Sequence, residues 1–81
     1  MYEKINEDIS VLGIYSAHMF IPKKFKWREK IFPIKEITLF NNVRDGSIKK
    51  RLYSVMSGTN LYRIEFNRDS ESWKILEVWC E

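Results

Sequence analysis

The stretch of sequence that decides the fold is YSVMSGTNLYRIEFNRDSESWKI, residues 53–75. Apolar residues alternate with polar ones on both sides of a Gly58-Thr59 turn, and again after a polar loop at residues 67–72. Successive side chains of a strand point to opposite faces, so this alternation indicates strands with one buried face. The turn and the loop set four apolar pairs opposite one another: Val55 with Tyr62, Tyr53 with Ile64, Phe66 with Trp73 and Ile64 with Ile75. These three strands are predicted to supply the core.

The segment before them continues the alternation. Phe25 and Trp27 alternate with basic residues, and a two-residue loop at residues 29–30 would place them opposite Ile34 and Phe32, respectively. The next strand is expected to run from residue 31 to about residue 41, with a bulge near residues 35–36, where the apolar parity changes.

The turn after that strand is predicted at Asp45-Gly46, a two-residue hairpin signal that would set Val43 opposite Ile48. A further strand, residues 9–16, is expected near the start of the chain, followed by a connection over residues 17–22. The sequence therefore predicts an all-β fold, a small antiparallel meander of five to six strands that forms an SH3-like or similar small barrel or half-barrel.

The domain is expected to cover residues 9–81, with residues 1–8 as a tail or a short N-terminal helix. The helix is an alternative because Tyr2, Ile5, Ile9 and Leu12 also follow helical spacing. The 81 residues allow one domain, and the 44% hydrophobic content is close to the globular average.

Cysteine and hydropathy limit the class of protein. Cys80 is the only cysteine, so an intramolecular disulfide and a cysteine-rich zinc site are both excluded. No apolar run approaches the roughly 18 residues that span a membrane, and the first residues lack the pattern of a secretory signal. A cytoplasmic protein without membrane contact is expected.

The net charge of +3 conceals an asymmetry along the chain. Residues 23–51 hold ten basic and three acidic residues, whereas the rest of the chain holds four basic and eight acidic residues. The basic segment therefore carries +7 and the remainder −4. Such a division favours a polyanionic partner if the fold keeps the two parts separate.

The hairpin formed by residues 23–35 is the candidate contact surface for a polyanion. Its basic side chains would project from the face opposite Phe25 and Trp27 and neutralise phosphates. The candidate residues are Lys23, Lys24, Lys26, Arg28, Lys30 and Lys35. Lysines on a strand also serve merely to solvate it and to block edge pairing, and this alternative stays open. Tyr15, Phe20 and Trp79 are the aromatics least committed to the core and are candidate partner contacts.

Catalytic, metal and cofactor sites are not expected. His18 is the only histidine, with no nucleophile or second ligand at motif spacing. Glu36, Glu65 and Glu77 lie on predicted strands, but acid–base catalysis needs carboxylates that converge in a cleft. The sequence thus favours a protein that is not an enzyme and carries no cofactor.

A set of spaced residues resembles an uncharacterised family of short prokaryotic all-β proteins. The set is Phe25-Lys26-Trp27-Arg28, Phe32, Ile34, Glu36-Ile37, Gly58, Tyr62, Trp73, Leu76 and Val78-Trp79. The family pattern is roughly F-x-W-R-G-x-x-Y-x-V-x-E-I, then a glycine turn and a final W-x-L-x-x-V-W. The likeness covers about residues 9–80, but Glu29 replaces the glycine and Phe32 the tyrosine. Related segments also occur as appendages of translesion-type DNA polymerase relatives, which implies a connection with repair and no catalytic role.

These observations together predict a non-enzymatic binding module. The preferred partner is nucleic acid or a nucleic-acid-processing protein, contacted through the basic hairpin. The alternative is a protein-interaction or oligomerisation domain that uses an apolar patch or an open strand edge.

Overall fold

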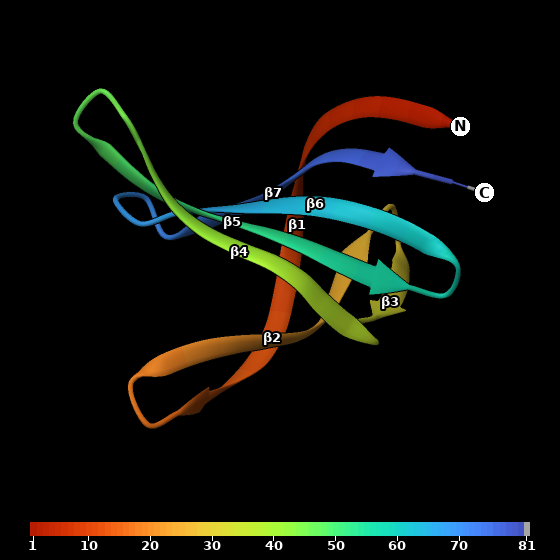
Figure 1. The fold of residues 1–81 in the computed structure, drawn as a ribbon, viewed down its shortest axis with the longest axis horizontal. Helices are drawn as coiled ribbons and strands as arrows, with labels where there is room; N and C mark the ends of the chain where they lie inside the picture. The colour runs from red at the N-terminus through yellow and green to blue at the C-terminus, as the bar shows by residue number, and fades with distance from the viewer. Residues whose placement is uncertain (81) are drawn as a thin grey trace.

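The computed structural model describes residues 1–80 and shows an all-β chain (Figure 1). Its strands are β1 (Tyr2–Ser16), β2 (Met19–Trp27), β3 (Lys30–Pro33), β4 (Glu36–Asp45), β5 (Ile48–Ser57), β6 (Asn60–Asn67) and β7 (Ser72–Trp79). The all-β class and the antiparallel meander are confirmed, but residues 1–80 contain seven strands rather than five or six. The expected strand from residue 31 to residue 41 is broken at residues 34–35 into β3 and β4.

The strands form one curled sheet in the order β3-β2-β1-β7-β6-β5-β4. Each strand pairs with the next along the chain except at β3 and β4, and β7 returns to pair with β1. The two edge strands, β3 and β4, do not pair with each other, and the gap between them is the open seam of the sheet. The linker at residues 34–35 forms backbone hydrogen bonds to strands on both sides of this seam. Ile34 N–H donates to the Lys23 carbonyl and Lys35 N–H donates to the Met56 carbonyl, each over 2.8 Å. The architecture is therefore a half-barrel whose seam is bridged by backbone hydrogen bonds.

The three strands β5, β6 and β7 have the predicted register. All four apolar pairs expected from residues 53–75 occur. Gly58 occupies the first position of the β5–β6 turn with a φ of +60°, which glycine adopts without a steric penalty. The buried apolar core comprises Phe25, Tyr53, Val55, Tyr62, Ile64, Ile75 and Val78. Most of the core thus comes from the segment that showed the clearest alternation.

The β2–β3 hairpin turns one residue earlier than predicted. Arg28 and Glu29 form the loop, with φ of +52° and +64°, as a type I′ turn requires. Phe25 consequently pairs with Phe32 instead of Ile34, and the two rings stack with centroids 5.0 Å apart. A register shift of two residues keeps every side chain on its predicted face, so the error changes the partners and not the core.

The β4–β5 hairpin is shifted in the opposite direction and turns one residue later than predicted. Its loop is Gly46-Ser47 rather than Asp45-Gly46, with Gly46 at a φ of +65°. A type II′ turn requires glycine at this first loop position. Val43 therefore pairs with Lys50 and not with Ile48.

Residues 2–8 are neither a tail nor a helix, because they form the first half of β1. This half pairs with β7, and the second half, residues 10–16, pairs with β2. The register shifts between Lys4 and Glu7, where Asn6 has a φ of +60°, and again between Leu12 and Gly13. The expected connection at residues 17–22 is also wrong, since a turn at residues 17–18 leads directly into β2.

Gly13 pairs with Pro22 of β2, next to the register shift between β1 and β2. A Cβ atom at this position would lie within 3 Å of the Ile21 carbonyl oxygen, the Phe20 ring and the Pro22 Cα. Backbone atoms cannot move aside as a flexible side chain can, so only glycine fits here.

We therefore expect Gly13→Ala to destabilise the protein by about 1–3 kcal/mol, the usual cost of overpacking. The free energy of unfolding from urea denaturation measures this effect. Ser10→Ala, at an exposed position of the same strand, is the control and should change stability little. Equal stability of the two variants would contradict the close approach.

Candidate functional site

The six basic residues predicted from the sequence are all exposed, and they lie on β2, β3 and the adjoining loops. Lys24 and Lys26 alternate with the buried Phe25 and so project from the outer face of the sheet. Lys35 lies in the linker that bridges the seam. The hairpin thus places its lysines in solvent, as the sequence predicted.

Two of the six cations have acidic partners. Arg28 makes hydrogen bonds of 2.7 and 3.2 Å to the two carboxylate oxygens of Glu7 on β1, and its guanidinium carbon lies 4.4 Å from the centroid of the Trp27 ring. Lys26 lies 3.7 Å from the Glu29 carboxylate. Within residues 1–80, no ion pair joins the remaining four, Lys23, Lys24, Lys30 and Lys35, to a carboxylate.

The Glu7 carboxylate ties β1 to the β2–β3 turn. It accepts a hydrogen bond of 2.8 Å from the Trp27 indole N–H in addition to those from Arg28. The Arg28 and Trp27 hydrogen bonds lower the pKa of Glu7, because both favour its charged form. Arg28 is therefore a structural residue of this hairpin, which the sequence did not indicate.

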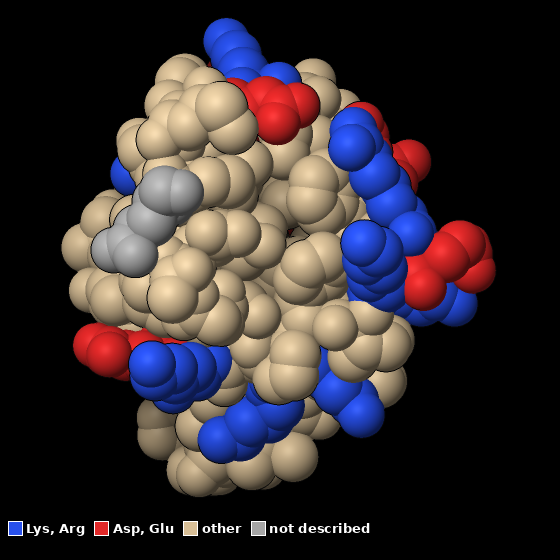
Figure 2. Space-filling view, turned by 90° about the vertical axis from the view of Figure 1, so that its right-hand side faces the viewer, with Lys and Arg blue, Asp and Glu red and all other residues tan. Residues whose placement is uncertain are grey.

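The end of the molecule that carries both termini is mainly uncharged. Figure 2 shows Lys and Arg side chains on the right-hand and lower parts of this face, several of them beside acidic side chains, around a central area without charged residues. Large apolar side chains accompany the lysines on the outer face of β1 and β3. Leu12 is 60% exposed, Ile14 53% and Ile31 52%, and Leu12 pairs directly with Lys24.

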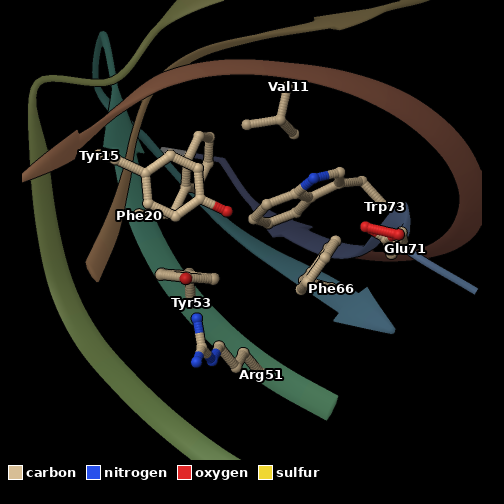
Figure 3. Close-up of a pocket in the computed structure, with 8 residues that line it drawn as sticks. All are labelled: Val11, Tyr15, Phe20, Arg51, Tyr53, Phe66, Glu71 and Trp73. Atoms are coloured by element: carbon tan, nitrogen blue, oxygen red, sulfur yellow. The ribbon is translucent and has the colours of Figure 1, made fainter. Parts of the chain in front are cut away.

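A cavity of about 260 Å³ lies on the inner face of the sheet, near its other end. It is lined chiefly by aromatic rings from five strands: Tyr15 of β1, Phe20 of β2, Tyr53 of β5, Phe66 of β6 and Trp73 of β7. Figure 3 shows these rings around an open centre. Tyr15 and Phe20, two of the aromatics predicted as partner contacts, are thus brought together at one site.

The rings contact one another around the cavity. Trp73 is central, with ring centroids 4.8 Å from Phe66, 5.5 Å from Tyr53 and 5.9 Å from Phe20. Tyr15 packs edge-on against Phe20 at 5.3 Å, yet it remains 77% exposed. The rings that contact Trp73 therefore form the packed inner wall of the cavity, and Tyr15 is an exposed ring at its entrance.

Arg51 brings a cation to this aromatic cavity. It lies two residues before Tyr53 on β5, so its side chain points to the same inner face. Figure 3 shows its guanidinium directed towards Tyr53. Its Nε atom is buried and has no hydrogen-bond partner. Burial raises the pKa of Tyr53, an effect that the neighbouring Arg51 cation opposes.

Further cations adjoin the cavity on the β4–β5 hairpin. Asn42, directly opposite Arg51, lines a shallow depression of about 380 Å³ together with Arg44, Lys49 and Arg68. The backbone N–H of Arg68 donates to the Lys49 carbonyl over 2.8 Å, which holds the β6–β7 loop beside β5. Lys50 also lines the depression, but it is paired with the Asp45 and Glu65 carboxylates at 3.6 Å each.

The sequence predicts Tyr53, Phe66 and Trp73 in the core and does not mark Arg51 as a site residue. Tyr53 is buried as expected, whereas Phe66 and Trp73 are only half-buried because they face the cavity. The sequence does contain a signal for Arg51. It lies two and four residues before Tyr53 and Val55, so on a strand its side chain shares their inward face.

The other candidate residues do not assemble into a catalytic or metal site. Glu65 is paired with Lys50, and Glu77 accepts from Tyr2 and pairs with Arg63. His18 is exposed in the β1–β2 turn. No group of three or more metal-ligating side chains occurs in the part of the chain that the structure describes.

Trp79, the third predicted contact aromatic, lies away from the cavity. Its ring packs against Tyr2 at 5.2 Å, and the Arg63 guanidinium carbon lies 5.8 Å from its centroid. Cys80 packs against the core cluster. Among the described residues there is no helix long and apolar enough to cross a membrane.

Comparisons with protein-family models, with curated proteins and with solved structures find no match for this chain.

We predict that Glu7→Gln removes an acid-sensitive part of the stability. The folded-state pKa of Glu7 lies below its ordinary value of 4.5, so its charge stabilises the fold above pH 4.5, and this contribution is lost as the pH falls through the lowered pKa. The free energy of unfolding of the wild type, measured in urea at pH 7 and pH 3, should fall more on acidification than that of the variant. Glu36→Gln, an exposed carboxylate on β4, is the control and should behave like the wild type.

Proposed function

We propose that this chain is a non-enzymatic binding module that contacts nucleic acid by attraction to its phosphates. The observation that carries the proposal is the position of the cations that have no ion-pair partner within residues 1–80. Eight of these ten Lys and Arg side chains lie on the β2–β3 hairpin with the seam linker (Lys23, Lys24, Lys30, Lys35) and around the β4–β5 hairpin (Arg44, Lys49, Arg51, Arg68). The other two, Lys4 and Lys74, lie on β1 and β7.

The surface around the β4–β5 hairpin suits nucleic acid better than the surface of the β2–β3 hairpin does. Its cations adjoin the aromatic cavity, and cations beside accessible rings suit both phosphates and bases. The lysines of the β2–β3 hairpin stand instead among the exposed apolar residues Leu12 and Ile31. We therefore assign the main contact to the β4–β5 hairpin and a supporting electrostatic contact to the predicted residues 23–35.

Two charge-reversed variants test this function. One replaces Arg44, Lys49 and Arg68 by Glu, and the other replaces Lys23, Lys24 and Lys30 by Glu, so that both lower the net charge by the same amount. Fluorescence anisotropy with labelled DNA and RNA at low salt should show wild-type binding that weakens as salt rises. The logarithm of the binding constant should fall linearly with the logarithm of the salt concentration, and each lost phosphate contact should make this slope less steep by about 0.7–0.9.

The first variant should lose affinity by at least about tenfold more than the second, because it removes the cations beside the cavity. Undetectable binding of every nucleic acid by the wild type at low salt would end the proposal. Unchanged affinity in both variants would do so as well. A loss confined to the second variant would keep nucleic-acid binding but return the contact to the β2–β3 hairpin.

A protein partner is the second candidate, favoured by the apolar patch of Leu12, Ile14 and Ile31, each more than half exposed. The edge strands β3 and β4 offer an additional docking edge. If the patch joins two copies, sedimentation should show concentration-dependent association that Leu12→Lys with Ile31→Lys abolishes. A monomer at all concentrations would exclude self-association through this patch.

A further inference from the structure

The cavity on the inner face is too small for a large ligand and is shaped for a flat one. Its volume of about 260 Å³ lies below the roughly 300–1,000 Å³ that drug-sized ligands occupy. Its walls are mainly the faces and edges of aromatic rings, which favour stacking with a planar guest. A single ring system therefore fits its size and its lining.

The polar groups of the cavity define the chemistry of the guest. Arg51 lines the cavity with a guanidinium, a group that only donates hydrogen bonds, so an acceptor on the guest would suit this wall. Glu71 lines the same cavity from the β6–β7 loop, and Figure 3 shows its carboxylate beside Trp73 and Phe66. A planar ring with hydrogen-bonding edges, such as a nucleobase, matches these groups better than a hydrocarbon.

The surroundings connect that ring to an anionic chain. Lys49 lies two residues before Arg51 on the same face of β5, about 6.6 Å away along the strand. Arg44 pairs directly with Lys49, and Asn42 with Arg51. The cationic depression thus continues from the cavity along the hairpin, where the phosphates next to a bound base would lie.

We infer that the cavity receives one unstacked nucleobase of a single strand, stacked among Tyr15, Phe20 and Trp73, while cations of the β4–β5 hairpin hold the adjacent phosphates. The inference rests on the proposed nucleic-acid binding and adds that the partner is single-stranded. In a duplex the base faces are covered by their neighbours, so only an unstacked base can enter.

The test compares a labelled single strand with its duplex on the full chain at low salt. Tyr15→Ala removes the exposed ring at the lip of the cavity, and Tyr2→Ala, an exposed tyrosine beside Trp79, is its matched control. Tyr15→Ala should weaken single-strand binding by about 5- to 100-fold, the usual worth of one stacked base, and leave duplex binding unchanged. Tyr2→Ala should leave both unchanged.

Two further variants test the polar groups. Arg51→Gln should weaken single-strand binding, whereas Arg63→Gln, on the outer face, should not. Glu71→Gln should strengthen it several-fold, because an acidic side chain at the cavity repels the phosphates. Circular dichroism and thermal melting confirm that each variant is folded, and the exposure of Tyr15 makes its removal compatible with folding.

The outcomes separate the two proposals. Equal affinity for single strand and duplex, with Tyr15→Ala no weaker than Tyr2→Ala, overturns the base-binding cavity and leaves nucleic-acid binding intact. Failure of the wild type to bind either form overturns both. A free mononucleotide that binds as tightly as the strand, and is weakened by Tyr15→Ala, keeps the ring site but overturns its assignment to a polynucleotide.

Discussion

The fold depends on the bend of β1, because the bend lets this strand form hydrogen-bonded ladders with two different strands along its length. Its first half pairs with β7 and its second half with β2, so this one strand joins the four strands β4–β7 to the β2–β3 hairpin. Gly13 permits the second half to approach Phe20 and Pro22 without a clash. Without this bend, β2 and β3 would lie apart from the core that β5, β6 and β7 build, and Phe25 would lose its packing against Tyr62.

The same inward and outward alternation produces both the core and the candidate site. Along β5, Val55 is fully buried and Tyr53 nearly so, while Arg51 faces the cavity and Lys49 the depression next to it. One strand face therefore changes from apolar to aromatic to cationic over a few residues. This gradient exists because the β4–β5 hairpin extends beyond the part of the half-barrel that the other strands cover.

The two ends of the molecule use their cations differently. At the β2–β3 turn, Arg28 holds Glu7 and stacks on Trp27, so its charge serves the fold. At the β4–β5 hairpin, Arg44 and Lys49 lie opposite each other although like charges repel. An arrangement that costs stability in the free protein is favourable when a polyanion lies between the cations.

The sequence by itself determined the strand class, the register of β5, β6 and β7, and the faces on which Phe25, Trp27 and the lysines lie. These follow from a period of two, which a register shift of two residues leaves unchanged. Only the tertiary structure decided the turns at residues 28–29 and 46–47, the role of residues 2–8 as a strand, and the meeting of Tyr15, Phe20, Arg51 and Trp73. The physical reason is that these depend on contacts between segments far apart in the chain, such as Arg28 with Glu7 and Phe20 with Trp73, which no local pattern specifies.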